Sequence, residues 1–328
     1  MKARIPAGMF LVSAASLMYE ISLARLLAIE LWHHYAFLII SCALLGYGAA
    51  GAFRLTWTGR IPLFLPVLSF SLLLIPLFLL SSQLPFDPAL MSLDPWHGGW
   101  MLLNFLLLAV PFFLAGLTLN LLLEQYTEHV HFLYASDLVG ASCGILLFFI
   151  FVPHLVETEL LGISTLLAVA GSLCLASGKK QNTAVVMISL ALMLGWFGLE
   201  KIKFRISDYK ELSLALRHPQ SRLLETQRDA SVRIDTLETP MARFAPGLSL
   251  KYRGTIPNQH GLTLDGDRFT GMSPLIPESL GPYLRYLPEW ILFFEQSPPD
   301  NVLIMKTIGG QQALASVEAG VSSIIVQT

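Results

Sequence analysis

Residues 100–123 read WMLLNFLLLAVPFFLAGLTLNLLL and contain no charged side chain. A helix of this length rises about 36 Å, which exceeds the roughly 30 Å thickness of a bilayer's hydrocarbon core. A helix that is apolar all round belongs inside a protein core or a membrane. The stretch therefore predicts a transmembrane helix, and it sets the class of the whole chain.

Six further stretches resemble it in length and apolar character. Hydrophobic residues make up 54% of the chain and charged residues 13%, whereas soluble domains carry about 25% charged residues. Residues 1–199 hold 7 Lys and Arg and 9 Asp and Glu, while residues 200–328 hold 14 of each. We therefore expect a helical membrane domain, 1–199, with about seven spans. The predicted spans are 6–31, 35–53, 61–82, 100–123, 132–153, 160–178 and 182–199.

The loop charges predict an orientation. On one side of the seven predicted spans lie Lys2, Arg4, Arg54, Arg60, Lys179 and Lys180. The other side has no Lys or Arg before residue 200, so the positive-inside rule predicts a cytoplasmic N-terminus, in a membrane of the bacterial inner type. Seven spans then predict that the domain after Leu199 lies on the outer side. Lys201, Lys203 and Arg205 favour the opposite side, and so would failure of 160–178 to span.

Three ionisable residues lie at membrane depth: Glu20, Arg25 and Asp137. Each is costly in hydrocarbon and should face the bundle interior. Either a structural polar clasp or a path for protons or substrate fits them, although a direct bridge between Arg25 and Asp137 is not expected from their positions. Ser136, Gly140 and Gly144 recur every four residues, a spacing that lets helix backbones approach closely in lipid.

Metal and nucleic-acid binding have little support in the sequence. Four histidines fall on the predicted outer side, but no spacing among them fixes a ligand set: His33, His34, His97 and His154. We expect no metal site, and these four are the candidates if one exists. The three cysteines lie in apolar runs without C-x-x-C spacing, and the net charge of −2 gives no reason to expect a nucleic-acid partner.

The residues after 200 are richer in charged residues and turn signals than residues 1–199. Helices are expected at 210–217 and 279–296, and strands at 222–227, 231–238 and 262–265, which together predict a small β-rich domain, 200–296. Residues 297–328 then predict the first βαβ unit of a Rossmann-like fold: a strand at 302–305, a turn ending in Gly309-Gly310, a helix at 311–319 and a strand at 323–327.

Several short sequence strings occur in an order that is known from one protein family. In the apolar part they are Ser16-Leu17-Met18-Tyr19-Glu20 and Tyr134-Ala135-Ser136-Asp137. In the polar part they are Tyr209-Lys210-Glu211-Leu212, Arg243-Phe244-Ala245-Pro246-Gly247-Leu248, Leu264-Asp265-Gly266-Asp267 and Tyr283-Leu284-Arg285-Tyr286. The chain resembles the membrane-embedded spermidine-synthase-like, or aminopropyltransferase-like, proteins. This resemblance implies a small β-domain before a methyltransferase-like Rossmann fold, which in active relatives moves an aminopropyl group from decarboxylated S-adenosylmethionine to a diamine in polyamine synthesis.

The chain departs from that pattern where chemistry is expected. The resemblance implies a glycine-rich turn for the nucleoside, but Lys306 and Ile308 leave only Gly309 and Gly310, and Gln327 stands where an acidic residue would hold the ribose. Only Asp265 and Asp267 remain as catalytic candidates. Both equally suit a turn.

Three functions remain open. The first is a catalytically inactive subunit or docking platform of a membrane complex, without a cofactor, whose partners are the lipid bilayer and other protein subunits. The second is a membrane-anchored aminopropyltransferase that uses decarboxylated S-adenosylmethionine, with its catalytic half beyond Thr328, because two strands cannot bury a Rossmann sheet. The third is a transporter that uses Glu20, Arg25 and Asp137.

Overall fold

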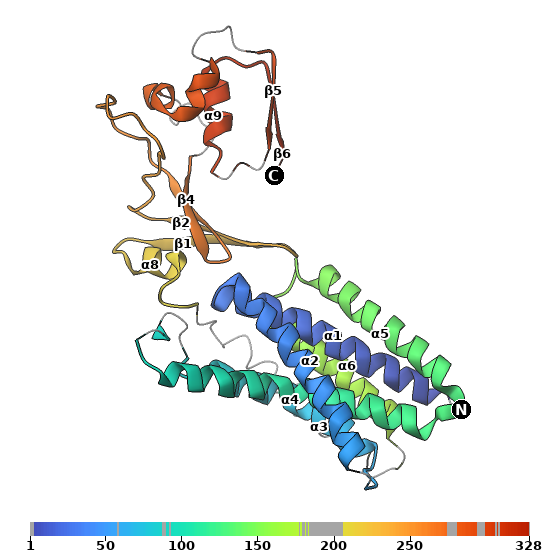
Figure 1. Cartoon of the computed structure of the whole chain (residues 1–328). Coiled ribbons are helices and arrows are strands. Elements are labelled where there is room, and N and C mark those ends of the chain that lie inside the picture. The colour runs from blue at the N-terminus through green and yellow to red at the C-terminus, as the bar shows by residue number, and fades with distance from the viewer. Residues whose placement is uncertain are drawn as a thin grey trace. The chain divides into compact units, whose positions relative to one another are not determined.

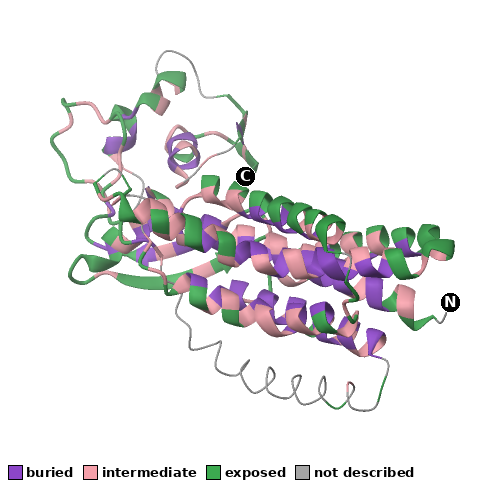
Figure 2. Cartoon of the chain, turned by 60° about the horizontal axis from the view of Figure 1, so that its bottom comes forward, coloured by how far each residue is buried: buried purple, intermediate pink, exposed green. Residues whose placement is uncertain are grey.

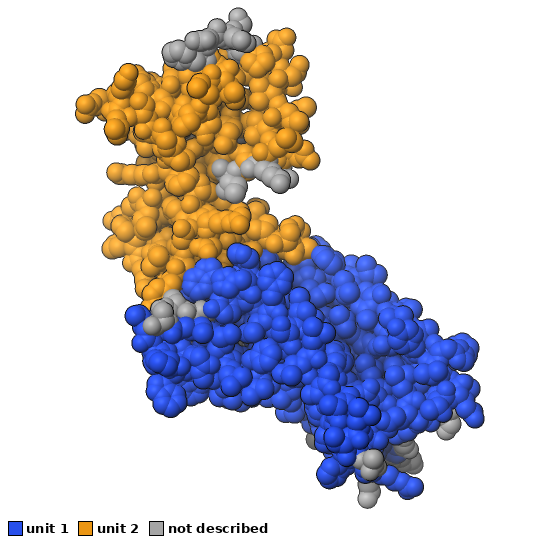
Figure 3. Space-filling view, viewed as in Figure 1, with its two compact units in different colours: residues 1–207 blue, residues 208–328 orange. Residues whose placement is uncertain are grey.

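The computed structural model divides the chain into two compact units, residues 1–207 and 208–328, which are coloured separately in Figure 3. The structure describes residues 3–57, 59–86, 90–91, 93–176, 178, 181, 183, 206–273, 281–293, 299–305, 307 and 309–327.

Six long helices build the first unit (Figure 1). They are α1 (Arg4–Glu30), α2 (His33–Thr56), α3 (Phe64–Ser82), α4 (Trp96–Gln125), α5 (Val130–Phe151) and α6 (Glu157–Leu175), with a 3₁₀ turn, η2 (Thr127–His129), between α4 and α5. All six are long and apolar enough to cross a membrane, which confirms six of the predicted helices. The seventh predicted span, 182–199, lies almost wholly outside the described residues.

The first helix lies at the centre of this unit. Helices α2, α5 and α6 pack on α1, α4 packs on α2, and α3 packs on α4 and α6. Val12, Tyr19 and Leu26 of α1 are fully buried. In Figure 2 the buried residues gather inside the helical unit, while exposed residues cover its outer faces. The outer faces of α2 and α5 carry exposed apolar side chains such as Leu44 and Leu146, as expected for helices that face lipid.

The second unit begins with a short helix and an antiparallel sheet. The elements are α8 (Glu211–Arg217), β1 (Arg222–Arg228), β2 (Arg233–Glu238), β3 (His260–Leu264) and β4 (Asp267–Met272), with strand order β1-β2-β3-β4. The sequence did not predict β4. Asp265 and Gly266 join β3 to β4 with φ angles of 51° and 73°, the positive values that a two-residue type I′ hairpin turn requires.

The predicted helix at 279–296 is wrong. In its place the structure has two short 3₁₀ helices, η4 (Pro282–Tyr286) and η5 (Pro288–Phe293). Pro288 lacks an N–H and cannot continue a helix that begins before it, and Leu287 has an extended backbone, with ψ 154°. Tyr283 is buried in η4, and this burial raises the pKa of its phenol.

The last elements agree with the predicted βαβ order. They are β5 (Asn301–Met305), α9 (Gln311–Glu318) and β6 (Ser323–Gln327). The strands β5 and β6 pair in parallel, with Asn301 opposite Ser323 and Met305 opposite Gln327. Leu303 and Ile325 of this two-stranded sheet are more than half exposed. The second unit is compact from residue 208 to residue 328, so the predicted division at 296 stays a prediction.

Candidate functional site

Three polar side chains share one face of α1. Ser13, Ser16 and Glu20 are separated by three and four residues, a spacing that places them on the same side of a helix. Ser13 and Ser16 are buried, and Glu20 is half-buried. Polar groups at membrane depth are costly unless neighbouring helices supply partners. The structure places partners from two other helices against this face.

The partners come from α5 and α2. The Ser13 hydroxyl donates a hydrogen bond of 2.5 Å to Asp137 Oδ1 on α5, and the hydroxyls of Ser16 and Tyr47 lie 2.7 Å apart, which joins α1 to α2. Glu20 lies on the same face of α1, one turn beyond Ser16. We call Ser13, Ser16, Glu20, Tyr47 and Asp137 the polar cluster. Sequence reasoning singled out its two carboxylates but missed its three hydroxyls.

Glycines on α5 make this arrangement possible. A Cβ added at Gly140 would lie 2.3 Å from a carbonyl oxygen of α1, and one added at Gly144 would lie 2.2 Å from another. No real Cβ atom comes so close, so only glycine lets α5 pack at this distance, as the small-residue spacing predicted. The hydroxyl of Ser136, the third residue of the predicted stripe, instead bonds to a carbonyl of its own helix. The close approach brings Asp137 to Ser13.

Arg25 belongs to a different part of α1. Helix α6 runs antiparallel to α1 with Gly8 against Leu175. Counting along both helices from that contact places Arg25 at the level of Glu157, which is 2% exposed. Asp137 bonds to α1 twelve residues before Arg25, a separation of about 18 Å along the helix axis. The structure therefore brings Glu20 and Asp137 to one cluster and leaves Arg25 outside it.

The candidate metal ligands do not assemble into a site. His33 and His34 begin α2, His97 lies in the first turn of α4, and His154 follows α5. Over the part of the chain that the structure describes, no three His, Cys, Asp or Glu side chains group closely enough to hold a metal ion. His34 instead packs among aromatic rings, with centroids 4.6 Å from Tyr35 and 6.4 Å from Trp32. Aromatic side chains concentrate in this way where helices meet the membrane surface.

The first catalytic candidate of the polar unit bonds to neighbouring elements of the same unit. Asp265 has a φ of 51°, its N–H donates to the Arg233 carbonyl over 2.7 Å, and its Oδ1 accepts from the Arg233 N–H over 2.8 Å. The carbonyl of Asp265 accepts 2.6 Å from the ammonium of Lys210, which is 1% exposed. Asp267 follows the turn and pairs with Leu264 at the start of β4. These contacts make Asp265 a structural turn residue, whatever else it does.

The glycine turn after β5 also makes an internal contact. Gly309 has a φ of 80°, and a Cβ added there would lie 2.5 Å from the carbonyl oxygen of Gly271 in β4. Gly310, with φ 73°, is the N-cap of α9. Gln327, the third residue of the expected nucleoside site, is exposed at the end of β6. Lys306, one of the two departures from the glycine pattern, lies outside the described residues, as does Ile308.

Phe244 ties the middle of the polar unit to α9. Its N–H donates 2.6 Å to Gln259 Oε1, and its carbonyl accepts 3.0 Å from Gln259 Nε2 and 2.5 Å from Gln311 Nε2. Gln311 is the first residue of α9 and is buried. Sequence reasoning missed both glutamines, since nothing in one sequence marks which amide will meet a particular backbone.

Two further groupings were also missed. Asp235 is fully buried on β2, where its Oδ1 accepts from the Arg233 guanidinium and from the Thr226 hydroxyl. In the helical unit, a cavity opens where α2 and α4 end, and its lining includes Arg54 and Glu124. The sequence offered one signal for the cavity, because Arg54 and Glu124 are ionisable residues at the ends of apolar runs.

Comparisons of this chain with protein-family models, with curated proteins and with solved structures found no significant match.

Proposed function

We propose that this chain is a membrane-embedded, spermidine-synthase-like protein whose polar unit acts as a non-catalytic docking platform in a membrane complex. The class of the proposal rests on six apolar helices of membrane length followed by a small sheet region and a parallel βαβ unit. The family part rests on the sequence strings and on how they lie in space.

Two of the strings that carry the resemblance in the polar unit contact each other. Leu212 donates its N–H to the Gly266 carbonyl over 3.0 Å, and Lys210 bonds to the neighbouring Asp265, so two of the strings form one local structure. Phe244, from a third string, is held by Gln311 at the start of α9. These contacts place the string Tyr209–Leu212 beside the string Leu264–Asp267, as the proposal requires.

The non-catalytic part of the proposal rests on one observation. The candidate site residues already make contacts within the polar unit. Asp265 uses its carboxylate on a backbone N–H and its carbonyl on an ammonium. The side of Gly309 on which another residue would carry its Cβ faces the Gly271 carbonyl. An aminopropyltransferase needs a turn that is open to the nucleoside and a carboxylate that can accept the amine's proton. Asp265 Oδ1 and the Cβ side of Gly309 already face groups of the same unit, which favours a structural role for both.

The test is calorimetric titration of the full chain, purified in mild detergent, with decarboxylated S-adenosylmethionine. We expect no saturable heat with millimolar ligand, while a soluble spermidine synthase in the same buffer serves as the positive control. Saturable micromolar binding would overturn the docking-platform function and favour the membrane-anchored aminopropyltransferase instead.

The proposal includes a seventh crossing. Leu175, at the end of α6, packs on Gly8 near the start of α1. The N–H of Ser207 donates to the Glu30 carbonyl at the other end of α1 over 2.8 Å. These two ends are about 33 Å apart along α1. The chain between Leu175 and Ser207 therefore connects opposite ends of the bundle, which supports a span at or near 182–199.

With this crossing, the N-terminus and the polar unit would lie on opposite sides of the membrane. Arg4, Arg54 and Arg60 lie at the end of the bundle where α1 begins, so the positive-inside rule makes that end cytoplasmic. The polar unit, which follows Ser207, is then on the outer side. A cysteine at Lys251 in a chain without native cysteines should react with an impermeant maleimide added to spheroplasts, and one at Arg4 should react only after lysis. The reverse pattern would refute this topology.

A second candidate function is a cation path along the polar cluster. It is favoured by the row of polar groups within these helices, in which Asp137 bonds to Ser13, Tyr47 bonds to Ser16, and Glu20 continues the same face of α1. In proteoliposomes, Glu20→Gln and Asp137→Asn should then abolish proton-coupled or amine flux that the unaltered chain supports. Equal flux in the unaltered and doubly substituted chains would exclude this function.

A further inference from the structure

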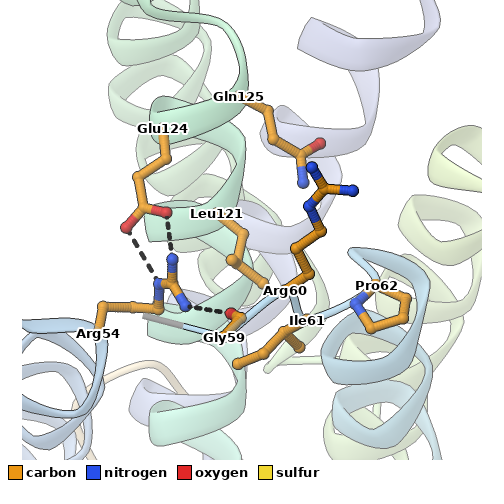
Figure 4. A pocket seen from close by; sticks show the side chains of 8 residues that line it. All are labelled: Arg54, Gly59, Arg60, Ile61, Pro62, Leu121, Glu124 and Gln125. Atoms are coloured by element: carbon orange, nitrogen blue, oxygen red, sulfur yellow. Dashed lines mark hydrogen bonds and ion pairs between the residues drawn. The ribbon is translucent and has the colours of Figure 1, made fainter. Parts of the chain in front are cut away.

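A cavity of about 540 Å³ lies where α2 and α4 end, beside the loop that leads to α3 (Figure 4). Its walls come from three segments of the helical unit, and none of the candidate site residues predicted from the sequence lines it. The lining residues are Arg54, Gly59, Arg60, Ile61, Pro62, Leu121, Glu124 and Gln125.

The first arginine of the cavity is fully engaged. Nε and Nη2 of Arg54 donate to the two carboxylate oxygens of Glu124 over 3.1 Å and 2.7 Å, and Nη1 donates to the carbonyls of Trp57 and Gly59 over 3.0 Å and 3.2 Å. The side chain of Arg54 is 15% exposed. This bidentate pair fixes the α2–α3 loop against α4 and neutralises both charges, so it forms a rigid polar wall.

The second arginine is not engaged in this way. Arg60 is exposed, and among the described residues it makes no recorded hydrogen bond or ion pair. Figure 4 shows its guanidinium and the side-chain amide of Gln125 on the same side of the cavity. Because Arg54 and Glu124 cancel, the cavity keeps one net positive charge, carried by Arg60. A guanidinium has five N–H donors in a planar fork that suits a phosphate, and an amide adds two more donors.

The remaining wall is apolar. Leu121 and Ile61 belong to a cluster that continues into the bundle through Ala50 and Leu117. The cavity therefore offers a cation and an amide donor on one side and aliphatic surface on the other. It also lies at the arginine-rich end of helices that span the membrane, where the surface of the cytoplasmic leaflet is anionic.

We propose that this cavity binds the phosphate of an anionic phospholipid headgroup. Arg60 pairs with the phosphate, and Gln125 donates its amide N–H groups to the same phosphate. Leu121 and Ile61 receive the glycerol and the first methylenes of an acyl chain. The pair between Arg54 and Glu124 shapes the cavity but does not bind the ligand.

The test is native mass spectrometry of the full chain in detergent, titrated with phosphatidylglycerol, with phosphatidylcholine as the zwitterionic comparison. Arg60→Ala and Gln125→Ala are compared with Arg4→Ala, an exposed arginine at the same end of the bundle. We expect Arg60→Ala to weaken phosphatidylglycerol binding by about tenfold and Gln125→Ala by a smaller factor, while Arg4→Ala leaves it unchanged. Arg60→Lys should restore binding only in part, because an ammonium cannot bind a phosphate bidentately.

Soluble glycerol phosphate separates the two possible sources of the phosphate. We expect it not to displace phosphatidylglycerol, because it lacks the acyl methylenes that contact the aliphatic wall. Displacement at equal concentration would replace the lipid by a free phosphate ester as the ligand. Equal lipid binding by Arg60→Ala and Arg4→Ala, with all variants eluting as folded protein on size exclusion, would overturn the site. These outcomes do not depend on the function proposed for the polar unit.

Discussion

The helical unit and the polar unit both depend on glycine, but for different physical reasons. In α5, Gly140 and Gly144 lie within a regular α-helix. Each matters because it has no Cβ, and a carbonyl of α1 lies where that Cβ would be. In the polar unit, Gly309 and Gly310 have φ angles of 80° and 73°, which other residues rarely adopt. The first pair is selected by packing and the second by backbone conformation.

The difference follows from the two solvents. Lipid tails are as apolar as the side chains, so apolar burial gives little drive for helices to associate, and close backbone contact must supply it. In water, the sheet and α9 gain from apolar burial, and the glycines of the β5–α9 turn are needed for their positive φ angles. Substitutions at Gly140 and Gly144 should therefore fail through collision alone. Those in the polar unit should fail through torsional strain or a lost polar contact, with collision added at Gly309.

The largest effect is expected at Gly144. In Gly144→Ala the new Cβ would lie 2.2 Å from a backbone oxygen of α1, so α5 must move away, which should lower the free energy of unfolding by about 3 kcal/mol. The measurement is unfolding by SDS titration from a mild detergent. Gly48→Ala on α2, where nothing lies within 4 Å, is the control and should be neutral or slightly stabilising. Equal losses in both variants would remove packing as the reason for glycine in this unit.

A lost polar contact should come next. Lys210→Met removes the buried ammonium that donates to the Asp265 carbonyl, and hydrogen bonds to charged groups contribute about 1.5–3 kcal/mol. We expect a loss of about 2 kcal/mol, visible as faster hydrogen–deuterium exchange in β2 and β3. The exposed Lys251→Met should exchange like the unaltered chain. If Lys210→Met did so too, the hairpin would not depend on this ammonium.

The two glycines of the β5–α9 turn separate strain from collision. Gly310→Ala meets no atom within 4 Å, so only its left-handed backbone should matter, at about 1–2 kcal/mol. Gly309→Ala adds a Cβ 2.5 Å from the Gly271 carbonyl oxygen and should cost more. Hydrogen exchange of α9 in the full chain measures both. Gly310→Asn should recover part of the loss, since asparagine tolerates this conformation; a larger loss than in Gly310→Ala would contradict the torsional explanation.

The smallest effect is expected within the polar cluster. Ser13→Ala removes the donor to Asp137, and hydrogen bonds between transmembrane helices contribute about 0.6 kcal/mol on average and at most about 1.7. SDS titration should therefore show a loss near 1 kcal/mol, against none for Ser142→Ala, whose exposed hydroxyl bonds only to its own helix. A loss above that of Gly144→Ala would mean that polar contacts, and not glycine packing, hold α5 to α1.

The sequence predicted the helices better than their contacts. Length and apolar character place six helices within a few residues of their observed ends, because both properties are local. Strand β4 was not predicted, because Asp267 and Gly271 disfavour strand structure. Pairing with β3 overrides that preference in the folded unit. The prediction of a helix at 279–296 did not take account of Pro288. Tyr47 and Ser16 meet across two helices, and one sequence contains no information on such a meeting.

The site was predicted in the same uneven way. Glu20 and Asp137 stood out because charge in an apolar run is rare, and the structure brings both to one cluster. Arg25 stood out equally but lies apart from them. Gln259 and Gln311 have no local signal, because their role depends on the backbone of Phe244, which meets them only in the folded unit.

The central place of α1 has a consequence for synthesis. Ser13 leaves the ribosome 124 residues before Asp137, and at about 5–20 residues per second this interval lasts roughly 6–25 s. During that time the first helix has neither α5 nor α6 beside it, and its polar face has no partner from α5. Insertion machinery that delays release of α1 until later helices emerge would shield that face from lipid. Of the helices that pack on α1, α2 therefore emerges first, and α5 and α6 emerge last.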